Sequence, residues 1–175
     1  LKSDGLVLPG VGAFSHGMKN LESYGLVDVI KEYAALDRPL MGICLGMQLL
    51  FEESEEFGKT EGLGLILGKV VKLPTKDNQN ENLPHVSWNK LNSNKVPWKN
   101  TILADTEEGS DMYFVHSFVA QPRDSYNILS LTEYSSYHFC SSVKKGNIYG
   151  CQFHPEKSGP TGLKIINNFI RMCEA

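Results

Sequence analysis

The sequence predicts an α/β fold in which a mainly parallel sheet, flanked by helices, is extended by antiparallel strands. In the first half, short apolar runs at 4–8 and 39–43 alternate with helical patterns, as in parallel β-α units. In the second half, apolar runs follow one another with no helical pattern between them, as in antiparallel sheets. These runs are 112–118, 126–134, 137–144 and 147–153, with Gly146-Asn147 as a turn signal.

The other elements follow from the same patterns. Residues 14–36 have helical periodicity with an interruption near Gly25. A helix is expected over 45–53, a strand over 65–73 that ends before Pro74, and a final amphipathic helix over 160–173. Residues 75–100, which include the polar tract Lys76 to Asn82, are expected to be rich in loops. With 175 residues, the chain has the size of one domain, which we expect to span 1–175.

Cys44 lies between Gly42 and Gly46, after an apolar run and before a helical one. This is the pattern of a nucleophile elbow, a strand-turn-helix bend so tight that side chains at these two positions would collide. Cys44 would then stand at a helix start, where unpaired amides favour a thiolate. An ordinary buried cysteine explains the motif about equally well when it is taken alone.

A second motif, His154-Pro155-Glu156, follows an apolar run. Pro155 disfavours a helical His154, and residues two apart in an extended segment share a face. Glu156 is therefore expected to contact one ring nitrogen of His154, with the other within or near hydrogen-bond reach of Cys44. Together the three supply a nucleophile, a base and an orienting group. The alternative is a surface histidine and a solvated glutamate in a turn.

The third motif is Pro9-Gly10-Val11-Gly12, a glycine-rich turn after a buried strand. Such turns can direct backbone amides at an anion, here the oxyanion formed when a thiolate attacks a carbonyl. Its glycines let the peptide planes about Val11 rotate at low steric cost. A phosphate loop is excluded because no Gly-Lys-Ser/Thr follows.

In this order, the segments Pro-Gly-Val-Gly-Ala-Phe, Gly-Ile-Cys-Leu-Gly-Met-Gln and Gln-Phe-His-Pro-Glu-Lys-Ser resemble the class I glutamine amidotransferases. Within that family, Glu-Glu-Ser-Glu-Glu and the Lys-Ser after His-Pro-Glu are similar to subunits that supply ammonia to a (β/α)₈ cyclase of histidine synthesis. The resemblance implies hydrolysis of L-glutamine through a thioester on Cys44. It assigns His154 as the base, Glu156 as its orienting group, and the backbone of Val11 and Leu45 as the oxyanion hole.

The resemblance also implies which residues bind the substrate and the partner. Its substrate residues are Gly10, Gly12, Gln48, Glu56, His116, Ser117 and Phe118. Each also has an ordinary explanation, since the last three lie in an apparent core strand and Glu56 in a solvated acidic cluster. Trp88 and Lys157 match positions that face the partner. Ser87 departs from the glycine usual in the family, which keeps a related glutaminase serving another synthase open as an alternative.

Family members begin with a further strand-helix-strand stretch, so we expect roughly 30–40 residues, about one β-α-β unit, ahead of Leu1. The net charge of −3 and the pI near 6.0 argue against nucleic acid and anionic membranes. No apolar run has membrane-spanning length, and the four cysteines show no metal spacing. We therefore expect a cytoplasmic enzyme without metal or cofactor. A catalytically silent binding subunit remains the alternative from another class.

Overall fold

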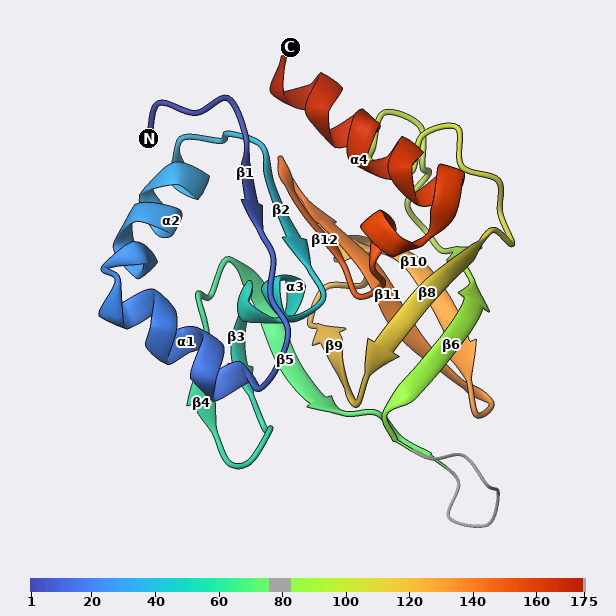
Figure 1. Ribbon diagram of the computed structural model, residues 1–175, viewed down its shortest axis with the longest axis horizontal. Coiled ribbons are helices and arrows are strands. Elements are labelled where there is room, and N and C mark those ends of the chain that lie inside the picture. The colour runs from blue at the N-terminus through green and yellow to red at the C-terminus, as the bar shows by residue number, and fades with distance from the viewer. Residues whose placement is uncertain (76–82, 175) are drawn as a thin grey trace.

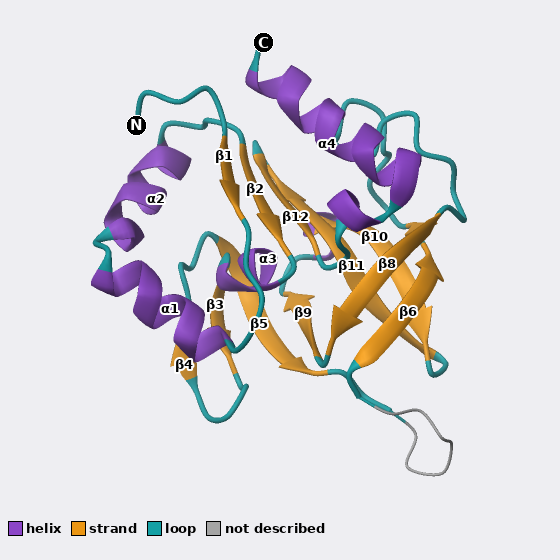
Figure 2. Cartoon of the chain, viewed as in Figure 1, coloured by secondary structure: helices purple, strands orange, loops and turns teal. Residues whose placement is uncertain are grey.

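The computed structural model describes residues 1–75 and 83–174, so the predicted polar loop Lys76 to Asn82 lies outside the described residues (Figures 1 and 2). Its centre is a parallel trio of strands. β1 (Leu6–Leu8) pairs with one side of β2 (Leu40–Ile43), as predicted for the first apolar runs. β12 (Ile148–Cys151), which was expected among the antiparallel strands, pairs in parallel with the other side of β2. The strand that carries Cys44 at its end is therefore held on both sides.

Helices cover both faces of this trio. α1 (Phe14–Ser23) and α2 (Leu26–Ala35) lie on one face, and the predicted break at Gly25 is confirmed by its left-handed φ of 65°. α4 (Gly159–Cys173) lies on the other. Leu40 packs in the cluster that contains α1 and α2, whereas Met41 packs in the cluster that contains α4. Burial on both faces explains why this strand is a continuous apolar run.

Antiparallel strands extend the parallel trio further than the sequence indicated. β11 (Tyr137–Lys145) pairs with β12, β10 (Ile128–Tyr134) and β9 (Phe118–Pro122). β9 in turn pairs with β5 (Ile66–Lys72), which is parallel to β3 (Phe51–Ser54). β4 (Thr60–Glu61) and β7 (Asn92–Ser93) complete the ten strands of this sheet among the described residues. The α/β class with antiparallel additions is confirmed.

The helix expected over 45–53 is wrong in its second half. α3 ends at Leu49, and β3 begins two residues later. Phe51 and Ser54 are fully buried where β3 pairs with β5, so strand pairing outweighs the helical preference of the glutamates between them. The acidic cluster that begins at Glu52 consequently lies on a strand and the turn after it, not at a helix end.

Two further expectations are corrected. The segment expected to be loop-rich contains β6 (His85–Lys90) and β7. The single strand expected over 112–118 is two strands, because β8 (Asp111–His116) ends before Ser117 and β9 begins after it. The inward positions of β6 are polar, with His85 buried and Ser87 and Asn89 half-buried, whereas Val86 and Trp88 are exposed, so the strand lacks the apolar run of a core strand.

β6 and β8 form a separate two-stranded antiparallel sheet (Figure 1). Its strand β8 contacts the short helix η2 (Pro155–Lys157), and His154, just before η2, donates its backbone N–H to the Tyr113 carbonyl at 2.9 Å. A second short helix, η1 (Ser125–Asn127), precedes β10. The described residues contain no helix long and apolar enough to cross a membrane. This outer sheet places His116, at the end of β8, next to the end of β2 that leads into Cys44.

Candidate active site

Cys44 occupies a strained turn between β2 and α3. Its φ of 53° and ψ of −112° are unfavourable for a residue with a side chain, and such strain is typical of a nucleophile elbow. The backbone is fixed on both sides: the N–H of Cys44 donates to the Cys151 carbonyl at 2.7 Å, and its carbonyl accepts the N–H of Gln48 at 3.2 Å. The predicted elbow is therefore present.

The two flanking glycines are required, for reasons that differ. A Cβ on Gly42 would lie 2.6 Å from the backbone of Gly46, which is the collision across the turn that the sequence suggested. A Cβ on Gly46 would lie 1.7 Å from the carbonyl oxygen of Leu8, on the neighbouring strand. Gly46 thus allows the elbow to approach β1, a contact between elements that the motif alone does not reveal.

Cys44 is a thiol in the resting chain, which reverses the expectation of a thiolate. Burial raises its pKa to about 11, and the negative charge of Glu156 adds to the increase. The backbone N–H of Leu45 and the side chain of Gln152 lower the pKa, but by less than burial raises it. α3 has only five residues, so its dipole is a weak counterweight. A base is needed to form the nucleophile.

Cys44 lines a pocket of about 310 Å³. The elbow forms one wall, and the ends of β8 and β9 form the opposite one. Most of the predicted substrate and oxyanion residues line this pocket: Val11, Gly12, Leu45, Gln48, Glu56, His116, Ser117 and Phe118. Pro84 and Val115 also line it and were not predicted. The Cys44 thiol lies 3.9 Å from the Val115 carbonyl oxygen.

Gln152 is a second residue that sequence reasoning missed. It is fully buried, and its amide nitrogen lies 3.8 Å from the Cys44 sulfur. The amide of Gln48 donates to the Gln152 side-chain oxygen at 3.0 Å and to the Phe118 carbonyl at 3.0 Å. A signal was available, because Gln152 lies two residues before His154 in an extended segment. The two glutamines join the elbow to the opposite wall of the pocket.

Glu56 is almost buried in the same pocket. One of its carboxylate oxygens accepts the backbone N–H of Phe14 at 2.7 Å, at the first residue of α1. Ala13, at the N-cap, has no side chain for this purpose, so Glu56 caps the helix from a distant segment. The carboxylate is therefore held in place at the pocket wall and keeps its second oxygen for another partner.

His154 and Glu156 form the contact that the sequence predicted. The Nδ1 of His154 lies 2.8 Å from a Glu156 carboxylate oxygen. A carboxylate only accepts hydrogen bonds, so the Nδ1–H group of His154 donates this one to Glu156. In the neutral ring, the other nitrogen, Nε2, therefore carries the lone pair. Among the described residues, Nε2 is buried and has no hydrogen-bond partner. The predicted base and its orienting group are assembled, but no hydrogen bond joins His154 to Cys44.

The three predicted catalytic residues face two neighbouring hollows. Cys44 lines the first, whereas His154 and Glu156 line a second, apolar hollow of about 400 Å³ together with Pro9, Gly10 and Ile43. Val11 lines both hollows and is 75% exposed. The loop that was expected to form the oxyanion hole therefore separates the nucleophile's pocket from that of the base.

The amide of Leu45, a predicted oxyanion donor, is occupied. Its N–H donates to the Gly10 carbonyl at 3.2 Å. Gly12 has a φ of 101°, and a Cβ there would meet nothing within 4 Å. The loop thus has the conformational freedom and the open space to change its peptide orientations. In this arrangement the oxyanion hole is not open.

The predicted partner residues lie on the surface beside this site. Trp88 on β6 is half exposed, and its ring is 5.9 Å from that of Tyr113. The Tyr113 ring is 6.4 Å from the His154 ring. Lys157, three residues after His154 in the sequence, is exposed in η2. Tyr113, which was not predicted, therefore lies between Trp88 and the base.

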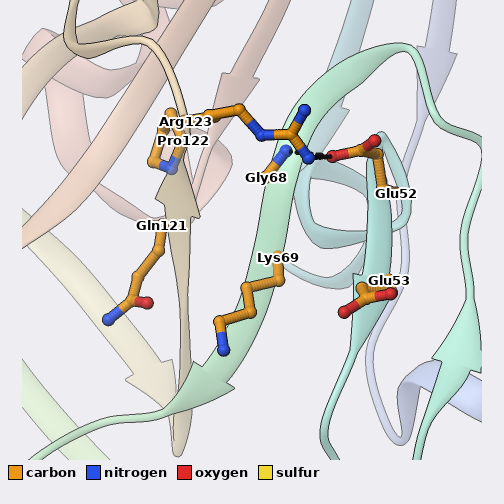
Figure 3. A pocket seen from close by; sticks show the side chains of 7 residues that line it. All are labelled: Glu52, Glu53, Gly68, Lys69, Gln121, Pro122 and Arg123. Carbon is orange, nitrogen blue, oxygen red and sulfur yellow. Dashed lines mark hydrogen bonds and ion pairs between the residues drawn. The ribbon is translucent and has the colours of Figure 1, made fainter.

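A further hollow lies across β3, β5 and β9 and contains none of the predicted site residues (Figure 3). Its charged side chains pair with each other or with neighbours: Arg123 contacts Glu52 at 2.8 Å, and Lys69 contacts Glu55 at 2.6 Å. Within the part of the chain that the structure describes, no group of three or more histidine, cysteine, aspartate or glutamate residues has the arrangement of a metal site.

Comparison with known proteins agrees with this geometry. Residues 2–173 match the family "Glutamine amidotransferase class-I". The chain is 46% identical over 176 residues to "Imidazole glycerol phosphate synthase subunit HisH 1" of Legionella pneumophila (strain Lens), covering 98% of this chain and 83% of that protein. It is also 46% identical over 173 residues to "Imidazole glycerol phosphate synthase subunit HisH" of Aquifex aeolicus (strain VF5), covering 99% and 80%.

A solved structure described as "Crystal structure of glutamine amidotransferase" superimposes with a TM-score of 0.70 at 17% identity, covering 98% of this chain and 80% of the other. That similarity supports the fold alone. The family match extends over nearly the whole chain, and the elbow, the His154–Glu156 pair and the glycine-rich loop all fall inside it. The chain belongs to the class I glutamine amidotransferase family.

Proposed function

We propose that this chain hydrolyses L-glutamine to glutamate and ammonia, and passes the ammonia to a cyclase subunit that forms imidazole glycerol phosphate in histidine biosynthesis. The observation that carries the proposal is Cys44, held in a strained elbow at the wall of a pocket that Gln48 and Glu56 also line. Membership of the family and the names of the relatives support the chemistry and the partner. As a biosynthetic enzyme, the complex would work in the cytoplasm.

The reaction begins with proton transfer from the Cys44 thiol to Nε2 of His154, whose imidazolium Glu156 stabilises. The thiolate attacks the amide carbon of glutamine, and the carbonyl oxygen becomes an oxyanion. His154 returns the proton to the departing nitrogen, so that ammonia leaves and a thioester remains. His154 then activates a water molecule, whose attack releases glutamate and restores the thiol.

The pocket residues bind the substrate in this proposal. The free oxygen of the Glu56 carboxylate receives the substrate ammonium, while the segment from His116 to Phe118 receives its carboxylate. Gln48 and the two loop glycines, Gly10 and Gly12, lie along the side chain of the bound glutamine substrate. The size and polarity of the pocket suit a small zwitterion better than a peptide, which argues against a peptidase.

The oxyanion hole needs a change before catalysis. The N–H of Leu45 must leave the Gly10 carbonyl, and an N–H from the Val11 region must turn toward the pocket. Because Val11 also separates the two hollows, the same movement would bring His154 and Cys44 into contact. We infer that docking of the partner on the face with Trp88 and Lys157 drives this change.

Ammonia that escapes into water at pH 7 becomes mostly ammonium and loses its nucleophilicity. A partner that receives it directly avoids this loss, which is a physical reason for a complex. The apolar hollow beside His154 lies on the docking face, so a partner would cover it. A (β/α)₈ cyclase remains the partner that the family resemblance implies.

The deciding measurement is glutamate release by the chain alone, with the cyclase, and with the cyclase plus its ribonucleotide substrate. We expect a low rate alone and an increase of at least about 100-fold in the full system, since a missing oxyanion donor costs about that factor. Equal rates in all three would contradict gating by the partner. No hydrolysis in any of them, with glutamine still bound, would favour a silent binding subunit.

A further inference from the structure

A chain of polar contacts, buried at its centre, runs from the pocket proposed for glutamine to the outer surface of β6. It begins at the Phe118 carbonyl, which lies 3.0 Å from Nδ1 of His116. Nε2 of His116 lies 2.9 Å from Nδ1 of His85, and Nε2 of His85 lies 2.7 Å from the side-chain oxygen of Asn89. Asn89 donates to the Glu133 carbonyl at 3.1 Å. Of these residues, the mechanism proposed above uses only His116 and Phe118.

The direction of the inner hydrogen bonds is determined by their acceptors. A carbonyl only accepts, so Nδ1–H of His116 donates to Phe118. Burial lowers the pKa of His116 to about 3, and the ring is neutral at working pH. Its Nε2 therefore carries a lone pair, and Nδ1–H of His85 must donate to it. The orientation of His116 in the pocket wall thus depends on a proton held by His85.

His85 is itself held without freedom to turn. It is fully buried, and its ring stacks on Tyr134 at 3.9 Å and on Phe114 at 5.3 Å between centroids. At its outer nitrogen, Nε2, the Ser87 hydroxyl oxygen lies 2.9 Å away and the Asn89 side-chain oxygen lies 2.7 Å away. The single proton of the Ser87 hydroxyl is donated to that Asn89 oxygen. A ring fixed by stacking on two faces and by polar groups at both nitrogens can set the position of its neighbour.

The two ends of the chain are functionally distinct surfaces. At the inner end, the Phe118 carbonyl accepts hydrogen bonds from both His116 and Gln48, so two sides of the pocket converge on one oxygen. At the outer end, Asn89 adjoins Trp88 in sequence and lines a surface hollow with it. β6 therefore carries the expected docking residue outward and the hydrogen-bonded histidine inward.

We propose that His85 is a positioning residue that orients His116 and the Phe118 carbonyl for glutamine binding and ties both to the docking strand. The inference rests on the proposed function, because it takes the pocket as the glutamine site. His85 touches neither the substrate nor Cys44. Its role is to transmit the position of β6 to the wall that holds the substrate.

The test measures glutamine affinity by calorimetry, in the complex with the cyclase and in a Cys44→Ala background that prevents turnover. His85→Phe keeps the aromatic packing and removes both nitrogens, and we expect the Kd to rise about tenfold for one lost buried hydrogen bond. His85→Asn places an amide near the Nδ1 position, so the Kd should stay within about threefold of the parent. His138→Phe, at an exposed position of β11, is the matched control and should leave affinity unchanged.

An unchanged Kd in a folded His85→Phe variant would overturn the proposal, as would equal losses in the Phe and Asn variants, since packing alone would then explain the effect. If His85→Phe does not fold, His85→Gln replaces it. The glutamine amide reaches the position of Nε2, on the side of Asn89, and leaves His116 without the donor that Nδ1–H supplied. The same loss of affinity is expected.

A readout that is independent of glutamine separates this inference from the proposed function. The ¹⁵N resonances of the His116 imidazole should show Nδ1–H and an Nε2 that accepts a hydrogen bond. The Nε2 resonance should shift in His85→Phe and be restored in His85→Asn. If the parent chain does not bind glutamine, the proposed function fails, while these spectra still decide whether His85 orients His116. An identical His116 spectrum in all variants would overturn the inference.

Discussion

The elbow and the glycine-rich loop lie side by side at the candidate active site, joined by the Leu45 N–H and the Gly10 carbonyl, and are built in contrasting ways. The elbow is crowded, since neither Gly42 nor Gly46 has room for a Cβ. The loop is open, since a Cβ on Gly12 would meet nothing and Val11 is 75% exposed. The position of Cys44 is therefore fixed by the fold, whereas the loop that carries a predicted oxyanion donor has room to rearrange, which suits the proposed control by a partner.

The first test of this comparison removes the nucleophile itself. Cys44→Ala should lower glutamine-dependent activity on the order of 10⁴-fold or more, because no other group can form the thioester. Synthesis driven by added ammonium salts should be unchanged in the complex. The measurement is product formation with glutamine and with ammonium side by side. Retained glutamine turnover would remove Cys44 from the mechanism.

The second test asks whether the elbow also prepares the charge of the nucleophile. Because the pKa of Cys44 is raised to about 11, the thiolate fraction should grow about tenfold for each unit between pH 7 and pH 10. Alkylation of Cys44 by iodoacetamide in the isolated chain should follow this slope, roughly 10³-fold in total. Cys44→Ala corrects for the other thiols. A plateau near neutral pH would reveal a thiolate-imidazolium pair that is already formed.

The third test compares the crowded and open glycines directly. Gly46→Ala should lower the free energy of unfolding by more than about 3 kcal/mol, because its Cβ would overlap the Leu8 carbonyl. Gly12→Ala should cost only about 1–2 kcal/mol, from its left-handed φ alone. Urea unfolding measures both. Similar losses at the two positions would contradict the contrast between a fixed elbow and a free loop.

The fourth test concerns the surface from which the loop would be controlled. Trp88→Ala should weaken cyclase binding by about 2 kcal/mol if the ring is a central anchor of the interface. Its half-exposed side chain contributes little to the core, so the melting temperature should change little. Calorimetry of the complex gives the affinity. Leu163→Ala, half exposed on α4, serves as the control, and an equal loss there would indicate an effect unrelated to docking.

The sequence by itself determined the features that depend on neighbours along the chain. The elbow needs glycines two residues on either side of Cys44. The His154–Glu156 contact joins residues two apart across Pro155, although the chain is extended only at His154 and Glu156 lies in the 3₁₀ turn η2, not in the extended segment that was expected. Both were predicted, and both are present. The parallel pairing of β1 with β2 was predictable from apolar runs that alternate with helical patterns. The expectation for 147–153 was wrong in part, because this run was placed among the antiparallel strands and β12 pairs in parallel with β2. The N-terminal extent of the protein, its domain organisation and the roles of the site residues stay predictions.

Tertiary structure decided what depends on residues far apart in the chain. The thiol state of Cys44 follows from its burial, which overrides the local helix start. β3 replaces the second half of the expected helix because β5 offers it a pairing edge. Gln152 reaches the thiol across 108 positions, and His85 meets His116 only because β6 pairs with β8. Hydrogen-bond partners and burial are properties of the packed chain, and no pattern of nearby residues encodes them.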